Sequence, residues 1–197
     1  MKNNKIKIIC TVGPTSFNED ILRKFETREV SLIRINLSHV PLDEIENYIV
    51  FLKKYNIPIA IDTEGAQVRT GIVGKKPIYF NTGEIVYIHR SKIICDNNNI
   101  YLTPSSVIDL LVSGDLLSLD FNSVLLRVED ISDLSNSNHI KTRVLIEGEV
   151  GNNKGVHCDN LTNKLPPFTN KDFRAVELAK KHNIIYFTLS FMNNSND

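Results

Sequence analysis

The chain has 197 residues, of which 42% are hydrophobic and 23% charged, a composition typical of a folded protein. Its 23 basic residues balance its 23 acidic residues, so charge provides no long-range attraction to nucleic acid or to an anionic membrane. The three cysteines form no C-x-x-C pair, and no apolar run approaches the roughly 18 residues of a membrane span. We therefore expect a cytoplasmic protein with no nucleic-acid or membrane partner.

The chain opens with a pattern of one strand and one helix. Residues 6–12 form a nearly continuous apolar, β-branched run that Gly13 and Pro14 close, as is typical of a buried parallel strand. Ser16 and Glu19 then have the spacing of a capping box, which predicts the start of a helix.

The same alternation continues through the next two predicted strands. Strands are predicted at 30–37 and at 57–62, and apolar side chains at helical spacing predict a helix over 45–52 between them. A βαβαβ pattern implies a parallel sheet with right-handed crossovers. Three strands alone do not distinguish a doubly wound sheet from a (β/α) barrel.

The sequence pattern changes after about residue 70. Short β-rich segments such as 85–88, 116–119 and 124–128 alternate with turns that contain Asn and Gly, and helical periodicity is absent. This pattern predicts an inserted, mostly antiparallel small barrel or sandwich.

The α/β pattern returns near the end of the chain. Thr169 and Asp172 are placed to cap a helix, and residues 184–189 predict a fourth buried strand that ends at Ser190. The predicted domain ranges are 1–69 for the first part of the α/β domain, 70–157 for the insertion and 158–197 for the continuation.

Polar side chains gather at the predicted carboxyl ends of the strands, the edge at which parallel α/β proteins bind ligands. Any one of them could also be an ordinary cap or turn residue. They are Thr11, Arg34, Asn36, Ser38, His39, Asp62, Thr63 and Ser190.

Three of these residues share one face of a strand. Arg34, Asn36 and Ser38 alternate at period two, and a buried core would not accept an unpaired guanidinium there. Asp62 could supply the partner, and a turn bracketed by glycines after it carries a second arginine, Arg69. The pattern indicates either a ligand site or a structural Arg34–Asp62 ion pair.

Six blocks of the chain resemble sequence motifs of pyruvate kinases, in the family's order and with its separations. The blocks are 7–16 (KIICTVGPTS, similar to KI(V/I)CTIGPAS), 34–39 (RINLSH, similar to R(L/M)N(F/L)SHG), 62–71 (DTEGAQVRTG, similar to DTKGPEIRTG), 151–156, 165–172 and 189–191. The resemblance covers nearly the whole chain.

The resemblance implies an α/β fold: a partial (β/α)8 TIM barrel of about four strands, with the family's small β-barrel lid, the B domain, inserted after the third. It also implies transfer of a phosphoryl group between phosphoenolpyruvate and ADP in glycolysis. Arg34 would contact that group. His39 and Arg69 would lie on the nucleotide (ADP/ATP) side, and Ser190 would belong to the binding site. Asn36, Ser38, Asp62 and the Thr63 carbonyl would hold potassium, which suits one carboxylate with several neutral oxygens.

The chain departs from the family pattern at several of these places. Gln67 stands where potassium-dependent members carry Glu and potassium-independent members carry Lys, so the sequence leaves the cation requirement open. Glu64 replaces a Lys and Asn193 an Arg, exchanges that make the neighbourhood less attractive to polyphosphate. Asp120-Phe121-Asn122 replaces a DDG turn in the lid.

The family's enolate-stabilising lysine and its magnesium carboxylates have no counterpart in the 197 residues, so we expect no appreciable kinase activity from this chain alone. Three interpretations follow. The first is an incomplete pyruvate kinase sequence: a truncated one, an interrupted reading frame, or one half of a split enzyme with a complementing C-terminal chain; a homo-oligomer is a further option. The second is a non-catalytic module that binds a phosphorylated ligand or a cation, or that regulates an intact homologue. The third treats the lid as the functional module, a small β-barrel that binds oligonucleotides.

Overall fold

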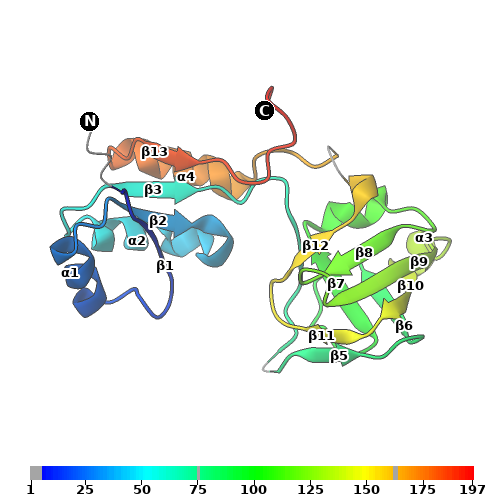
Figure 1. The fold of residues 1–197 in the computed structure, drawn as a ribbon. Coiled ribbons are helices and arrows are strands. Elements are labelled where there is room, and N and C mark those ends of the chain that lie inside the picture. Colours follow the sequence, from blue (N-terminus) through cyan, green and yellow to red (C-terminus); the bar gives the residue numbers. More distant parts are fainter. Residues whose placement is uncertain (1–5, 75, 162–163) are drawn as a thin grey trace. The chain divides into compact units, whose positions relative to one another are not determined.

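The computed structural model describes residues 6–74, 76–161 and 164–197, and the chain divides into two compact units. The first unit comprises residues 1–66 and 166–197, and the second comprises residues 67–165. Each unit is described separately below (Figure 1). Among the described residues, no helix has the length and apolar content needed to cross a membrane.

The first unit is a parallel four-stranded sheet with three helices. The strands pair in the order β1-β2-β3-β13, and every pair is parallel. The strands are β1 (Ile9–Val12), β2 (Leu32–Asn36), β3 (Ile59–Asp62) and β13 (Tyr186–Thr188), and the helices are α1 (Glu19–Thr27), α2 (Ile45–Leu52) and α4 (Asn170–Lys181). Strand order thus follows chain order, because each strand is added beside its predecessor.

All three helices contribute side chains to one core on one face of this sheet. Alternate strand residues such as Ile33, Ile35 and Ile61 are fully buried in it, together with Leu22 of α1 and Ile49 of α2. The intervening strand residues therefore point to the opposite face, since side chains alternate along a strand. That opposite face carries the polar residues of the predicted site.

The α4 start follows the predicted pattern, whereas the α1 start does not. Thr169 and Asp172 form the capping box at α4, as predicted. At α1 the cap is Asn18, whose side chain accepts a hydrogen bond from Ile21 N at 3.0 Å, so the prediction of a cap at Ser16 is wrong. Ser16 instead accepts a hydrogen bond from Gly13 N at 3.0 Å in the preceding turn, because a hydroxyl near a turn can satisfy that turn first.

The first and last strands were predicted to be buried, and that prediction is also wrong. Within the described sheet β1 pairs only with β2, and β13 only with β3. Ile9 is therefore 60% exposed, and Tyr186 and Phe187 are 48% and 38% exposed. A β-branched or aromatic run predicts a strand, but only the pairing order decides which strands lie at an edge.

The second unit is a closed barrel with the strand order β10-β6-β7-β4-β12-β8-β9. All neighbouring pairs are antiparallel except β6 and β7, and β5 and β11 form a separate two-stranded ribbon. The elements are β4 (Val68–Thr70), β5 (Ile78–Phe80), β6 (Ile85–His89), β7 (Asn99–Thr103), β8 (Leu116–Leu119), β9 (Val124–Asp130), α3 (Leu134–Ser137), β10 (His139–Ile146), β11 (Gly148–Val150) and β12 (Gly155–His157).

The barrel interior is filled by alternating aliphatic side chains, as expected for a small barrel. Val86, Ile88, Leu117, Leu126 and Ile140 are fully buried. The residues between them along each strand point outward, among them Tyr87, Arg127 and Lys141.

An ion-pair cluster joins the start of α2 to the end of α4 in the first unit. Glu46 Oε1 accepts hydrogen bonds from Lys181 Nζ at 2.7 Å and from His182 Nε2 at 2.8 Å. These bonds, that from Lys181 first, lower the pKa of Glu46 from 4.5 to about 2. A lowered carboxyl pKa stabilises the folded state above the unfolded pKa, and this stabilisation is lost as the pH falls from about 4.5 toward 2.

We expect Glu46→Gln to unfold at a temperature that depends less on pH than the wild type does over this acidic range. The measurement is thermal unfolding at neutral and acidic pH, monitored by circular dichroism. Glu177→Gln is the matched control, because Glu177 forms an exposed i,i+3 ion pair with Arg174. An equal acid sensitivity of the wild type and Glu46→Gln would contradict this assignment.

Candidate active-site edge

Arg34 lies near the carboxyl end of β2, between two other strands. Its Nε donates to Thr11 Oγ1 at 2.8 Å, and its Nη1 lies 3.3 Å from Asp62 Oδ2. The Asp62 side chain is 4% exposed, and its Oδ1 accepts a hydrogen bond from Ser190 Oγ at 2.6 Å. The register brings these groups together, since Thr11 pairs with Arg34 and Asn36 pairs with Asp62. The predicted Arg34–Asp62 ion pair is present, and the Arg34 side chain remains 35% exposed, open to a ligand.

Of the four predicted cation ligands, Asn36 and Asp62 end β2 and β3, and Thr63 directly follows β3. Ser38 lies in the 3₁₀ turn after β2, so the prediction that it shares a strand face with Arg34 and Asn36 is wrong. Asn36 and Asp62 are register partners, and Ser38, Asp62 and Thr63 are each less than a tenth exposed. Asn36 Oδ1 accepts a hydrogen bond from Ser38 N at 3.0 Å, which turns the chain back over the strand end. One carboxylate among amide, hydroxyl and carbonyl oxygens is a donor set that fits a large monovalent cation better than magnesium.

The loop that follows Asp62 is held by the N-terminus of α4. Asp172 is 1% exposed, and its carboxylate accepts hydrogen bonds from Glu64 N at 2.7 Å and Gly65 N at 3.2 Å. Glu64 also forms an ion pair with Lys171 at 2.9 Å. The sequence predicted Asp172 only as a helix cap. Its second role, as the acceptor for the backbone of the loop after Asp62, joins residues 108 positions apart in the chain. No local sequence pattern could have indicated this contact.

Gly65 allows a close approach between this loop and the end of β13. Its φ is +66°, and a Cβ atom there would lie 1.9 Å from the Ser190 carbonyl oxygen. Thr63 Oγ1 accepts a hydrogen bond from Ser190 N at 3.0 Å, and Phe191 O accepts one from Ala66 N at 3.1 Å. Only glycine fits here, because both the positive φ and the contact exclude a side chain.

Three other residues that the sequence singled out lie on other elements of the chain. His39 is exposed in a short 3₁₀ turn, Leu37–His39, just after β2. Arg69 belongs to the second unit, on β4, where its Nη1 donates to Asn153 O at 2.7 Å. Gln67 also belongs to the second unit, and its buried Oε1 has no hydrogen-bond partner among the described residues.

The turn between β8 and β9 replaces the family's DDG motif with three residues in left-handed backbone. Asp120, Phe121 and Asn122 have φ values of 46°, 56° and 71°. Phe121 is 95% exposed, and Asp120 Oδ2 pairs with Lys154 Nζ at 3.1 Å. The hairpin therefore forms without the glycine of the family motif, at the cost of backbone strain.

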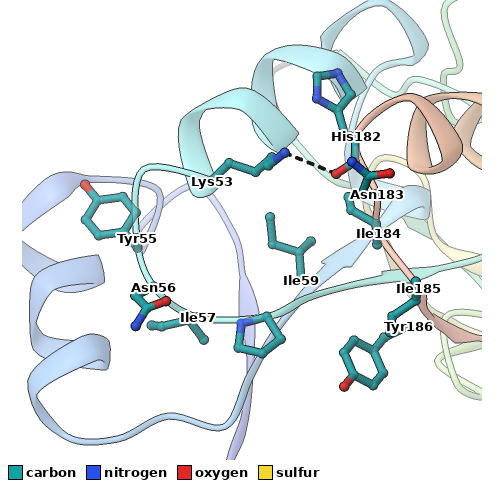
Figure 2. Close-up of a pocket in the computed structure, with 11 residues that line it drawn as sticks. Lys53, Tyr55, Asn56, Ile57, Ile59, His182, Asn183, Ile184, Ile185 and Tyr186 are labelled. Carbon is teal, nitrogen blue, oxygen red and sulfur yellow. Dashed lines mark hydrogen bonds between the residues drawn. The ribbon is translucent and has the colours of Figure 1, made fainter.

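A pocket of about 360 Å³ lies at the opposite, amino-terminal ends of β3 and β13 (Figure 2). Lys53 faces it, but its Nζ donates to His182 O at 3.1 Å (Figure 2). Active-site residues of parallel α/β proteins lie at the carboxyl ends of the strands. This pocket lies at the amino-terminal ends, so it is not part of the candidate site. Among the described residues, no group of three or more His, Cys, Asp or Glu side chains is placed to hold a metal ion.

These features define the class of protein: a parallel α/β sheet with an accessible arginine beside a buried carboxylate at its carboxyl edge, and a closed β-barrel inserted in the chain. The family profile described as "Pyruvate kinase, barrel domain" matches residues 3–197. The chain belongs to the pyruvate kinase family.

Individual relatives agree with this assignment. The chain is 27% identical over 197 residues to a pyruvate kinase of Thermotoga maritima and 29% identical over 199 residues to one of Staphylococcus haemolyticus. These alignments cover 97% and 98% of this chain but 41% and 34% of the relatives. The crystal structure of Cryptosporidium parvum pyruvate kinase matches with a TM-score of 0.86 at 25% identity, over 95% of this chain and 40% of that one. The chain thus spans well under half the length of these relatives.

Proposed function

We propose that this chain forms the phosphoryl- and cation-binding part of a pyruvate-kinase-type active site. Arg34 contacts the transferring phosphoryl group of phosphoenolpyruvate, while Asn36, Ser38, Asp62 and the Thr63 carbonyl hold a potassium ion beside it. The observation that carries the proposal is an accessible Arg34 guanidinium 3.3 Å from the buried Asp62 carboxylate, with Asn36 as the register partner of Asp62 at the same sheet edge.

Charge explains what each group contributes. A planar guanidinium matches two phosphate oxygens and supplies fixed positive charge where negative charge accumulates during transfer. Thr11 and Asp62 hold Arg34 on two sides, so its fork is already oriented before ligand arrives. Bound potassium would add a second positive charge near the same oxygens.

The sheet supports a partial (β/α)8 barrel as the fold of the first unit. A doubly wound sheet reverses its strand order and carries helices on both faces. Here strand order follows chain order, and the three helices share one core on one face. The exposed side chains of β1 and β13 favour further strands at both edges, from the same polypeptide, a complementing chain or a homo-oligomer.

In this proposal the second unit is the lid. Arg69 of the second unit and His39 of the first unit are the proposed contacts to ADP or ATP. Magnesium belongs to the complete reaction, and the family's magnesium carboxylates and enolate-stabilising lysine have no counterpart in the 197 residues. Residues 1–197 tested alone are therefore expected to bind phosphoenolpyruvate without turning it over. The cytoplasmic location stays a prediction.

One observation favours the alternative of a non-catalytic phospholigand or regulatory module. Glu64 stands at a position where the family carries Lys. Its carboxylate accepts hydrogen bonds from Lys171 Nζ and Thr169 Oγ1. A positive charge of the family's site is thus replaced by a structural ion pair. This module would use the same Arg34 edge to bind, so the binding predictions below apply to both.

The cation assignment predicts a specific stabilisation by potassium. Potassium chloride is expected to raise the unfolding temperature of the wild type above that in tetramethylammonium chloride of equal ionic strength, because a ligand of the folded state stabilises it. Asp62→Asn, which removes the only carboxylate of the ligand set, is expected to lose this difference.

The measurement is thermal unfolding in the two salts. Asp20→Asn is the matched control, since Asp20 lies in the exposed first turn of α1. A potassium effect that persists in Asp62→Asn would place the cation elsewhere.

A further inference from the structure

Two histidines of the β-barrel unit lie side by side on its outer surface. His89 ends β6 and His139 begins β10, and the two residues are direct cross-strand partners. Both are half-buried, and their ring centroids are 5.2 Å apart. Tyr87, two residues before His89, contacts the His139 ring edge-on at 4.8 Å between centroids.

The hydrogen bonds of His89 define which of its ring nitrogens carries the proton. Asn99 Nδ2 lies 3.0 Å from Asp96 Oδ1, and a carboxylate only accepts, so the amide group facing Asp96 is the NH₂. The Asn99 oxygen therefore faces His89 Nε2, at 2.8 Å. Because that oxygen can only accept, His89 Nε2 carries a proton, and in the neutral ring the lone pair is on Nδ1.

His139 reaches the complementary state through the backbone. Its Nδ1 lies 3.0 Å from the Ser137 carbonyl oxygen, which can only accept. Nδ1 therefore carries the proton, and the lone pair is on Nε2. Each ring thus donates one N–H to a carbonyl oxygen and keeps the other nitrogen basic, which is how metal-binding histidines are usually oriented.

The spacing of the rings also suits a shared ion. Bonds of about 2.0–2.1 Å from each nitrogen to a tetrahedral zinc ion place the two ring centres about 5 Å apart. The observed 5.2 Å between ring centroids matches this spacing, and the cross-strand pairing of His89 with His139 sets it.

We propose that His89 and His139 form a two-histidine site for a borderline divalent transition metal such as Zn²⁺, with its remaining positions open to water or an external ligand. Imidazole nitrogen selects zinc, nickel and copper over magnesium. The nearby charges permit a cation, since the Lys141 ammonium is paired with Glu129 at 3.5 Å and the Asp96 carboxylate lies behind Asn99. The site is independent of the phosphoryl site in the first unit.

The test is a calorimetric titration of the whole chain with zinc chloride near neutral pH, repeated with magnesium chloride. One zinc ion per chain and no magnesium binding are expected. His89→Gln and His139→Gln are each expected to weaken zinc binding by at least about tenfold, because each removes a ligand. Asn99→Ala should weaken it by about 10–100-fold through loss of ring orientation alone.

His157→Gln is the matched control, because His157 is an exposed histidine of the same unit that pairs with Asp159. No zinc binding by the wild type, zinc binding that survives both single substitutions, or a loss in His157→Gln would overturn the proposal. If a substituted chain does not fold, the imidazole NMR signals of the wild type decide. Zinc must shift those of His89 and His139 and leave that of His157 in place. A pair that only packs as aromatic rings would show no such shift.

Discussion

Asp172→Ala is expected to destabilise the sheet unit by about 3–5 kcal/mol, the largest stability effect that we predict for one side chain. The carboxylate is buried and accepts hydrogen bonds from Glu64 N, Gly65 N and Thr169 N, at 2.7, 3.2 and 2.9 Å, and from Thr169 Oγ1 at 3.1 Å. Alanine leaves three backbone donors without their acceptor, and each such loss costs about 1–3 kcal/mol, although the costs do not add fully.

Urea unfolding followed by circular dichroism measures this effect. Asp172→Asn keeps one acceptor oxygen and is expected to lie between the wild type and Asp172→Ala. Asp20→Ala, in the exposed first turn of α1, is the control and should change stability by less than about 1 kcal/mol. A loss of under about 1 kcal/mol in Asp172→Ala would show that the loop does not depend on this carboxylate.

The same substitution should also disturb the ligand edge. Asp172 holds the loop that begins at Thr63, whose carbonyl is a proposed potassium ligand. We therefore expect folded Asp172→Ala to bind potassium more weakly than the wild type. This coupling connects the start of α4 to the phosphoryl site.

Arg34→Ala is expected to reduce phosphoenolpyruvate affinity by about 100-fold or more, because it removes two hydrogen bonds to a charged group. Hydrogen bonds to charged groups contribute about 1.5–3 kcal/mol each, and about 1.4 kcal/mol is a factor of ten. Arg34→Lys should recover only part of this loss, since an ammonium cannot form the two parallel bonds of a guanidinium. Calorimetric titration of each variant with phosphoenolpyruvate measures the change.

Two controls separate binding from folding in this experiment. Arg174→Ala removes an exposed arginine of α4 whose partner is Glu177, and it should bind as the wild type does. Circular dichroism must show that Arg34→Ala is folded, because Asp62 loses its charged partner. Unchanged affinity in folded Arg34→Ala would remove Arg34 from the site.

Much of the first unit could be predicted from sequence because its signals are local. The run at 57–62 predicted β3, and the Thr169–Asp172 spacing predicted the start of α4. The period-two pattern predicted that Arg34, Asn36 and Ser38 share one face of a strand. This is confirmed for Arg34 and Asn36, which alternate with the buried core residues Ile33 and Ile35. It is wrong for Ser38, because the strand ends at Asn36 and Ser38 lies in the following 3₁₀ turn. Local chemistry determines these features, so one sequence is enough to find them.

The features that were missed depend on residues far apart in the chain. Which strands become edges depends on the order in which they pair, so the exposure of Ile9 and Tyr186 could not be predicted. Asp172 reaches a loop that precedes it by more than a hundred residues. His89 and His139 meet only because β6 and β10 close the barrel. No periodicity within a short window carries such information.

The most direct test of the central claim is a calorimetric titration of residues 1–197 with phosphoenolpyruvate, in potassium chloride and in tetramethylammonium chloride of equal ionic strength, with and without magnesium. If Arg34 and the oxygens of Asn36, Ser38, Asp62 and Thr63 form one site, phosphoenolpyruvate binds, and it binds more tightly in potassium. Absence of binding in potassium, or equal affinity in the two salts, would contradict the account.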